Sequence, residues 1–284
     1  MSTRNMRVIG LCLLLNGCAI NVTPEKIIYQ DKQVVSLDVE KMQSSFDTDL
    51  SMAKLSKVSI NTADGVILNG ISFIHPQAKV SIVLFGGSGM KISSSVKILE
   101  RFALIPANVT WFDYRGVGAS TKKESLSIDD FKKDALNVFD FANKLNKQDL
   151  PIIIHGISMG SIIVSELINE RNIDGVVLDG AIGSVTDLIT QTTPLWTKLF
   201  STVTVSPELA SLNNIDKIRE YQKPLLLLVG ENDETTPVKF SQALYDVSSS
   251  KVKILTIIPD IDHGRTMKKE EAILAYQEFI KQIP

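Results

Sequence analysis

The sequence has few of the residues that would indicate a metal site, a disulfide framework or a nucleic-acid-binding surface. It contains two cysteines and three histidines in 284 residues, with no H-E-x-x-H motif or Cys/His cluster of the kind that binds zinc. The formal net charge is −2 and no basic stripe is present, so we expect no nucleic-acid partner. We therefore predict a protein that works without a metal or another cofactor.

The sequence has no hydrophobic run long enough to cross a bilayer, and the apolar run at the N-terminus is also too short. Residues 8–15 are apolar and follow two arginines, as in a signal peptide core. They lead into the sequence LNGC at 15–18, which resembles the bacterial lipoprotein signal, in which cleavage precedes a cysteine that is acylated with fatty acids such as palmitate. We expect residues 1–17 to be this signal and Cys18 the lipidation site. The alternative is an incidental cysteine in a signal peptide cut elsewhere.

Such a leader has consequences for location and for stability. Ala19 follows the cysteine, which by resemblance to enterobacterial lipoproteins favours the outer membrane, facing the periplasm. Removal of residues 1–17 would take away two arginines and no acidic residue, so the net charge would change from −2 to −4. Cys12 would also be lost, so no disulfide could form within the chain, and stability would depend on the core alone.

Apolar runs of strand length alternate with helical patterns along the rest of the chain. Ser127 and Asp130 fit a capping box, and apolar residues follow them at three-four spacing as far as Leu145. This alternation predicts a mostly parallel sheet of about eight strands with helices on both faces. The strands are expected at residues 58–60, 66–73, 80–85, 109–113, 150–155, 175–179, 224–230 and 252–258.

The expected domain organisation is simple. Residues 18–55 are polar and irregular, so we interpret them as a tether and approach segment with one short helix, and residues 56–284 as one α/β domain. Residues 181–222 are longer than a single crossover needs. They would form either a small helical cap over the site or an ordinary packed helix with a long loop.

The pentapeptide at 156–160 reads G-x-S-x-G and lies between an apolar strand pattern and a helix pattern. Strand, tight turn and helix is the context of a nucleophile elbow, which would expose the hydroxyl of Ser158 at the carboxyl edge of the sheet. The same turn would aim the amide of Met159 at the space beside that hydroxyl. A Gly/Ser-rich turn without a catalytic role is the alternative.

A serine nucleophile requires a base, and each of the three histidines is a candidate. His155 lies in the strand before the elbow, so we expect a structural role. His75 lies in a loop between early strands. His263 follows the last strand within a polar loop at a carboxyl end, and we therefore predict that it is the base.

The base in turn needs a carboxylate to fix its tautomer. Asp233 follows the leucine-rich strand and gives the chain order serine, acid, histidine. Asp179, which ends the strand after the elbow, is its serious rival. Other acids in the nearby loops also compete, namely Glu231, Glu234 and Asp262.

The Gly-rich loop at 86–89 follows the strand at 80–85 and would supply a second oxyanion-hole amide. Gly87 is the favoured donor, and Ser88 is the alternative. The loop does not match a phosphate-binding G-x-x-x-x-G-K-[ST] motif, because Lys91 stands where the second glycine should be.

Taken together, these motifs resemble those of the α/β-hydrolase superfamily over residues 57–284. A further match is the segment at 113–120, DYRGVGAS, in which the resemblance implies that Asp113 and Arg115 brace the loops around the site. The chain looks most like single-domain serine hydrolases such as the Bem46-like and ABHD17-like acyl hydrolases. One departure is Phe85, where many members have histidine.

These patterns predict a membrane-anchored, monomeric serine hydrolase acting on a small acyl ester or thioester. Two other classes remain open. A peptidase or amidase would use the same triad, and a non-catalytic envelope lipoprotein could use the fold for binding. A haloalkane dehalogenase is disfavoured, because the elbow contains serine instead of aspartate.

Overall fold

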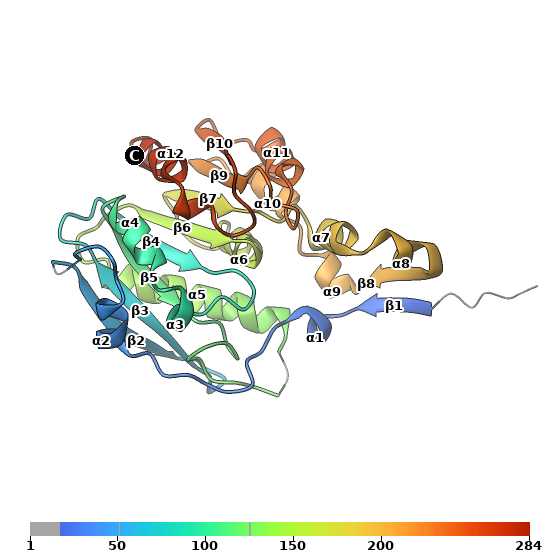
Figure 1. Ribbon diagram of the computed structural model, residues 1–284, viewed down its shortest axis with the longest axis horizontal. Coiled ribbons are helices and arrows are strands. Elements are labelled where there is room, and N and C mark those ends of the chain that lie inside the picture. The colour runs from blue at the N-terminus through green and yellow to red at the C-terminus, as the bar shows by residue number, and fades with distance from the viewer. Residues whose placement is uncertain (1–17, 51, 125) are drawn as a thin grey trace, which may run out of the picture.

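In the computed structural model, residues 18–50, 52–124 and 126–284 are described, so the expected signal peptide lies outside them. An eight-stranded sheet forms the centre of the molecule (Figure 1). β3 runs antiparallel to both of its neighbours, and the six strands from β10 to β5 are parallel. In spatial order the strands are β10 (Lys253–Ile258), β9 (Leu225–Gly230), β7 (Gly175–Asp179), β6 (Ile152–Ile157), β4 (Val80–Phe85), β5 (Ala107–Phe112), β3 (Ile67–Ile74) and β2 (Lys54–Asn61).

Helices cover both faces of this sheet because its central strands are buried throughout their length. One face packs against α2 (Val39–Ser44), α4 (Ile98–Ala103) and α12 (Glu270–Ile280). The other face packs against α5 (Ile128–Leu145), α6 (Met159–Leu167), α10 (Asn214–Glu220) and α11 (Val238–Val247). The layers agree with the predicted parallel sheet and its two helical layers.

The first turn of α5 has the predicted capping box. The Ser127 hydroxyl accepts a hydrogen bond from the Asp130 amide at 3.2 Å, and the Asp130 carboxylate accepts one from the Ser127 amide at 3.3 Å. Each bond satisfies a backbone donor that a helix N-terminus leaves free. The helix therefore begins where the sequence indicates, and its apolar residues face the sheet.

The segment interpreted as a tether is packed against the domain over much of its length. It contains α1 (Pro24–Ile27) as well as α2, where one short helix was expected. Leu37 and Met42 belong to the core, and the Asp31 carboxylate accepts a hydrogen bond from the Gly118 amide at 2.7 Å. The interpretation as a tether is therefore wrong for residues 31–42, in which the two buried apolar side chains, Leu37 and Met42, are five residues apart and fit neither a strand nor a helix period.

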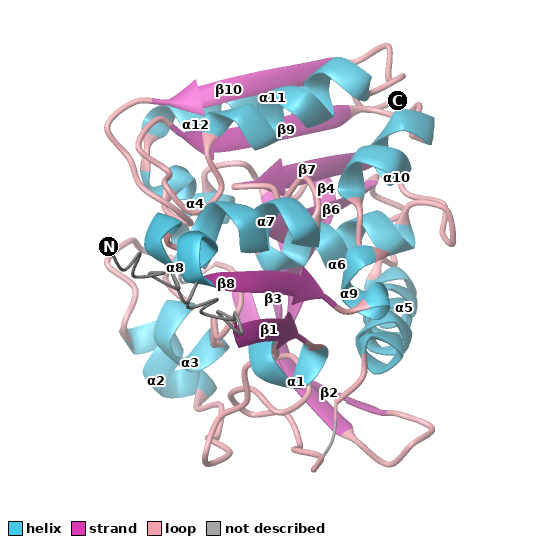
Figure 2. Ribbon diagram, turned by 90° about the vertical axis from the view of Figure 1, so that its right-hand side faces the viewer, coloured by secondary structure: helices cyan, strands magenta, loops and turns pink. Residues whose placement is uncertain are grey.

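A second, two-stranded sheet lies apart from the first and was not predicted. β1 (Cys18–Val22) pairs in parallel with β8 (Ser201–Val205). Figures 1 and 2 show this pair beside α7 (Val185–Thr192), α8 (Leu195–Phe200) and α9 (Pro207–Ala210), in a lobe that projects from the main body. Val22 and Val205 pack against the cluster formed by Ile162, Ile182, Val185, Leu209 and Leu212. Among the described residues, no helix is both long and apolar enough to span a bilayer.

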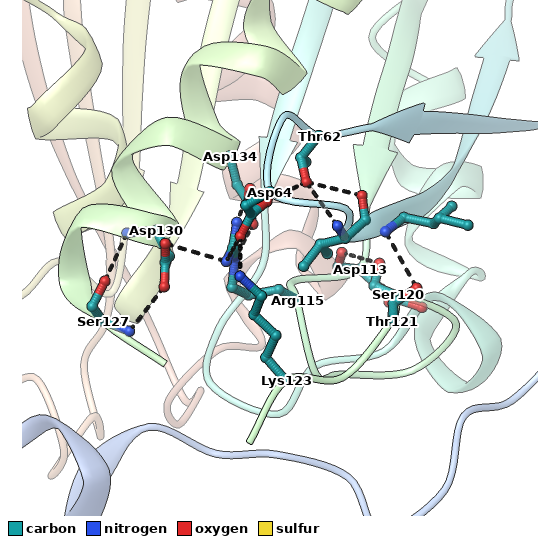
Figure 3. A network of polar contacts seen from close by, with 12 residues as sticks. Thr62, Asp64, Asp113, Arg115, Ser120, Thr121, Lys123, Ser127, Asp130 and Asp134 are labelled. Atoms are coloured by element: carbon teal, nitrogen blue, oxygen red, sulfur yellow. Dashed lines mark hydrogen bonds and ion pairs between the residues drawn. The ribbon is translucent and has the colours of Figure 1, made fainter. Parts of the chain in front are cut away.

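Arg115 lies at the centre of a buried ionic network (Figure 3). Its side chain is 1% exposed, and its guanidinium makes two bonds of 2.6 Å to the Asp134 carboxylate. A further bond of 3.0 Å goes to Asp64, and Asp130 lies 3.4 Å away. The network joins the turn before β3, the DYRG segment and the first half of α5, as the expected bracing role requires.

Asp113 braces the neighbouring loops through backbone amides. One carboxylate oxygen accepts from the Ile92 amide at 2.8 Å and the other from the Ala119 amide at 2.9 Å. Burial raises the pKa of Asp113 to about 6, against the lowering effect of these two bonds. The start of α3 (Ile92–Ser95), which follows the Gly-rich loop, is thereby attached to the DYRG turn.

Replacing Arg115 by glutamine should destabilise the protein strongly. Removal of one partner leaves the buried Asp134 carboxylate uncompensated, at a cost of about 3–5 kcal/mol in the free energy of unfolding. Urea denaturation measures this loss. Lys123→Gln is the matched control, because Lys123 pairs with the same network through Asp64 but is 39% exposed, and such pairs contribute about 0–1 kcal/mol. Equal losses for the two variants would contradict the assignment of the network to the core.

Candidate active site

Ser158 lies between β6 and α6 in a backbone conformation that few residues adopt, with φ 51° and ψ −113°. Two glycines make this turn possible. A Cβ added at Gly160 would lie 2.0 Å from the carbonyl oxygen of Phe85, and one at Gly156 would lie 2.5 Å from the Gly160 carbonyl oxygen. The G-x-S-x-G spacing is therefore a steric requirement of a tight strand-to-helix turn that brings Ser158 to the sheet edge.

The structure brings Ser158, His263 and Asp233 together from three separate loops. His263 Nε2 lies 2.9 Å from Ser158 Oγ, and His263 Nδ1 lies 2.7 Å from Asp233 Oδ2. The loops follow β6, β10 and β9 respectively, so all three side chains meet at the carboxyl edge of the sheet. An ionised carboxylate can only accept hydrogen bonds, so Nδ1 carries the proton and Nε2 is free to accept the serine hydroxyl.

Asp233 is held in place by its own loop. Its Oδ1 accepts from the amides of Thr235 at 3.0 Å and Thr236 at 2.7 Å, and the Thr236 hydroxyl donates to Oδ2 at 2.8 Å. The side chain is 1% exposed. These bonds fix the carboxylate that faces the imidazole, and Thr236 is a positioning contact that sequence reasoning missed.

Asp233 and His263 each stabilise the charged form of the other. Burial pushes the pKa of His263 down, but the hydrogen bond and charge of Asp233 outweigh it, and Asp179 and Asp262 add to them, so the pKa lies above its ordinary value. Burial likewise raises the pKa of Asp233, but its bonds to His263 and Thr236 outweigh this, and the pKa lies below its ordinary value. Asp233 therefore stays ionised over the range in which His263 titrates.

The rival acids lie elsewhere. Asp179 is buried, and its Oδ2 accepts a hydrogen bond from the Thr266 hydroxyl, whereas His263 is bonded to Asp233. Asp262 is exposed and pairs with Arg265 at 3.3 Å. Glu231 and Glu234 are exposed loop residues. The geometry thus separates Asp233 from the four alternatives that the sequence left open.

His155 is fully buried below the elbow. Its ring stacks on Tyr276 at a centroid distance of 5.7 Å and meets the edge of Phe102 at 5.5 Å. Within the described residues its two ring nitrogens have no hydrogen-bond partner. Packing of this kind agrees with the structural role expected for this histidine.

The Gly-rich loop lies against the elbow. A Cβ added at Gly87 would have Ser158 Cβ as its nearest neighbour, at 3.6 Å, and Gly87, Ser88 and Met159 all line the same cavity as the serine. The Tyr114 hydroxyl donates to the Gly86 carbonyl at 2.8 Å and so holds the loop. The tyrosine of the DYRG segment was not singled out from the sequence, although its motif was.

A largely apolar cavity of about 1060 Å³ opens beside Ser158 and His263. Its floor comes from α6 and the loops of the main sheet, and its outer wall comes from the segment 181–222. Val185, Leu188 and Ile189 of α7 line it, as do Ile27 and Ile28 after β1. Residues from helices of this segment therefore line the cavity beside Ser158, and residues of the N-terminal segment line it as well.

Five cationic side chains and one carboxylate are the charged groups among the described residues that line this cavity. The carboxylate is Glu166, which pairs with Lys132 at 3.0 Å. The remaining cations are Lys97, Arg101, Arg265 and Lys268. No cluster of three or more His, Cys, Asp or Glu side chains suited to a metal is found among the residues that the structure describes.

Comparison with known proteins identifies the family. A model of the family described as serine aminopeptidase, S33, matches residues 76–220, which is just over half of the chain. The chain belongs to this family of α/β-hydrolases. It is therefore a hydrolytic enzyme, and the predicted α/β-hydrolase fold is confirmed.

Individual relatives agree with this assignment. The hydrolase is 26% identical to Protein bem46 of Schizosaccharomyces pombe over 236 residues, 80% of this chain and 76% of that protein. It is 26% identical to lysophosphatidylserine lipase ABHD12 of Xenopus tropicalis over 187 residues, but these span only 47% of that protein. Esterase Pf2001 of Pyrococcus furiosus has a similar fold, with a TM-score of 0.70 at 22% identity over 91% of this chain and 98% of that chain.

The raised pKa of His263 predicts the pH dependence of this hydrolase. If His263 is the base, it must be neutral to accept the serine proton, so activity should fall as the pH drops through its pKa. Because that pKa is raised, the acid limb of kcat/KM should lie above the pH of about 6.5 expected for an unperturbed imidazole. A pH profile of ester hydrolysis with a neutral substrate measures it. An acid limb clearly below that pH would contradict the role of the His263–Asp233 pair.

Proposed function

We propose that this enzyme cleaves carboxylic esters or thioesters through an acyl-enzyme on Ser158, with His263 as base and Asp233 as its orienting acid. The observation that carries the proposal is the continuous hydrogen-bonded chain from Asp233 to Ser158 at the edge of an apolar cavity. Nothing else in the described part of the chain places a nucleophile, a base and a carboxylate in this order.

The chemistry follows from the positions of the atoms. Ser158 Oγ bonds to the substrate carbonyl carbon as His263 Nε2 takes its proton, and the carbonyl electron pair moves to the oxygen. The amides of Met159 and Gly87 stabilise that oxyanion. Collapse expels the alcohol or thiol, which takes the proton from His263. Water then attacks the acyl-enzyme with His263 as base, which releases the acid and returns a proton to Ser158.

The cavity favours an acyl chain over a peptide N-terminus. At about 1060 Å³ it is as large as typical drug-sized ligand pockets, and its lining is mostly aliphatic. An aminopeptidase must bind a positively charged α-amino group close to the nucleophile. Glu166 is the one carboxylate among the described lining residues, and it is already paired with Lys132 at 3.0 Å and Lys217 at 3.9 Å. Lys97 and Arg265 are likewise paired, with Asp47 and Asp262, so within the described lining Arg101 and Lys268 are the cations that would repel an ammonium group.

The membrane anchor belongs to the same proposal. The LNGC sequence at 15–18 supports acylation of Cys18, and the name of the lipase ABHD12 supports a lipid-like substrate. We infer that the protein is a monomeric enzyme of the cell envelope. Its lipid anchor would hold it on a bilayer, where it would hydrolyse acyl esters. Mass spectrometry of the mature N-terminus tests the anchor, because an unmodified Cys18 would contradict it.

A series of p-nitrophenyl esters tests the substrate class. Each methylene that the cavity buries in the transition state should raise kcat/KM by up to about fourfold, because burial contributes about 0.8 kcal/mol per methylene. We expect a rise from acetate to at least octanoate. Aminoacyl p-nitroanilides are the comparison, and faster turnover of these amides than of the octanoyl ester would favour the aminopeptidase that the family name suggests.

A further inference from the structure

We propose that the projecting lobe docks on the lipid bilayer, with Leu195 and Trp196 of α8 entering its interfacial region and the cavity filling from the membrane. The lobe consists of β1, β8 and helices α7 to α9 (Figures 1 and 2). The docking proposal goes beyond the proposed hydrolysis, but rests on it for the substrate that would enter the cavity.

The anchor residue lies at this lobe through backbone pairing. β1 pairs with β8 in a register that sets Cys18 opposite Ser201, the residue directly after α8. Paired strands lie about 4.8 Å apart, and Trp196 precedes Ser201 by five residues, or about 8 Å of helix. A lipid carried by Cys18 would therefore enter the bilayer next to α8, so the lobe would be held against the membrane.

The surface of α8 suits that environment. Leu195 is 78% exposed and Trp196 is 67% exposed. Lys198 is the one charged residue in the sequence from 188 to 206, although 22% of the chain is charged. Tryptophan is favoured at the membrane–water interface because its ring is apolar and its N–H is polar. Such a surface is costly to expose to water and stable in the headgroup region.

The docked lobe also has a direct connection to the substrate cavity. Leu188, Ile189 and Thr192 of α7 line the cavity, and α8 begins three residues later in the chain. Ile27 and Ile28, at the end of the short helix α1 that follows β1, also line it. A lipid in the bilayer leaflet that the lobe contacts would thus meet the wall of the cavity.

Fluorescence of Trp196 tests the docking directly. The chain has two tryptophans, and the other, Trp111, is 1% exposed. A chain that begins at residue 18 retains Cys18 as its single cysteine, so it can be coupled through a maleimide lipid to phosphatidylglycerol–phosphatidylethanolamine vesicles. We expect a blue shift of the emission and quenching by brominated lipid chains. In Trp196→Phe the remaining emission, from Trp111, should not respond to the vesicles.

Partition of an uncoupled Cys18→Ser chain gives the energetic test. Leu195→Ser and Trp196→Ser should each weaken vesicle binding about tenfold, because each removes a large apolar side chain from the interface. Leu274→Ser is the matched control, because Leu274 is 56% exposed on α12, away from the lobe (Figure 1). Both lobe variants should hydrolyse water-soluble p-nitrophenyl acetate at the normal rate but lose about tenfold on a long-chain ester dispersed in vesicles.

Two results would overturn the docking surface. One is coupled protein whose Trp196 emission stays unquenched by brominated lipid. The other is a blue shift that appears without vesicles and grows with protein concentration, since this would mean that α8 contacts a second copy of the chain. The vesicle measurements require no catalysis, so the two proposals can fail separately. Docking without ester hydrolysis would contradict the proposed function, and ester hydrolysis without quenching would contradict the docking.

Discussion

Replacement of Ser158 by alanine is expected to lower the turnover of p-nitrophenyl esters by about 10⁴-fold or more, to the level left by binding and the oxyanion hole. The fold should survive, because the turn is set by Gly156 and Gly160 and alanine occupies less space than serine. The hydroxyl donates to His263 Nε2, and its loss removes the atom that would bond to the acyl carbon.

Labelling by a fluorophosphonate probe provides the chemical readout for the same variant. The wild type should form one phosphonylated serine, which tryptic mass spectrometry should find in the peptide that contains Ser158. Ser94→Ala is the matched control, because Ser94 also lines the cavity but its hydroxyl donates to the Lys91 carbonyl at 3.3 Å and not to the histidine. Labelling that persists in Ser158→Ala, or that vanishes in Ser94→Ala, would remove Ser158 from its role.

Most of the candidate site could be predicted from the sequence, because its parts lie at ends of strands that are easy to recognise. The runs at 80–85, 152–157 and 225–230 consist mostly of apolar residues, as is typical of strands buried on both faces. Parallel strands place their carboxyl ends at one edge, so loops that are distant in the chain meet there. Ser158 and Asp233 each follow such a strand and His263 follows the parallel edge strand β10, and this is why chain order alone favoured Asp233.

The lobe could not be predicted for the opposite reason. β1 and β8 are five residues each and are separated by most of the chain, and β8 alternates threonine with valine or serine in a stretch without a clear core face. Two strands of this length carry little information in isolation, and their pairing depends on Val22 and Val205 packing over α6 and α7. Residues 31–42 illustrate the same limit, since Leu37 and Met42 are buried while the neighbouring Val34 and Val35 are exposed, and no regular period in the sequence separates the two kinds.

Asp233→Asn should cost about 10³–10⁴-fold in kcat with little change in the fold. An asparagine can turn its amide N–H toward His263 Nδ1, which then accepts a hydrogen bond and leaves the ring proton on Nε2. That nitrogen could no longer accept the proton of Ser158. The loss of the negative charge should also lower the pKa of His263, so the acid limb of the pH profile should move to lower pH even as the maximal rate falls.

Asp179→Asn is the decisive comparison, because Asp179 is the buried acid that could replace Asp233 in this role. Its bond is to the Thr266 hydroxyl, and its charge acts on His263 only through space, with a smaller raising effect on the pKa than that of Asp233. We therefore expect Asp179→Asn to move the acid limb down slightly and to keep most of the rate at alkaline pH. A larger loss in Asp179→Asn than in Asp233→Asn, in protein with normal thermal unfolding, would mean that the imidazole turns toward β7 during catalysis and that Asp179 is the acid.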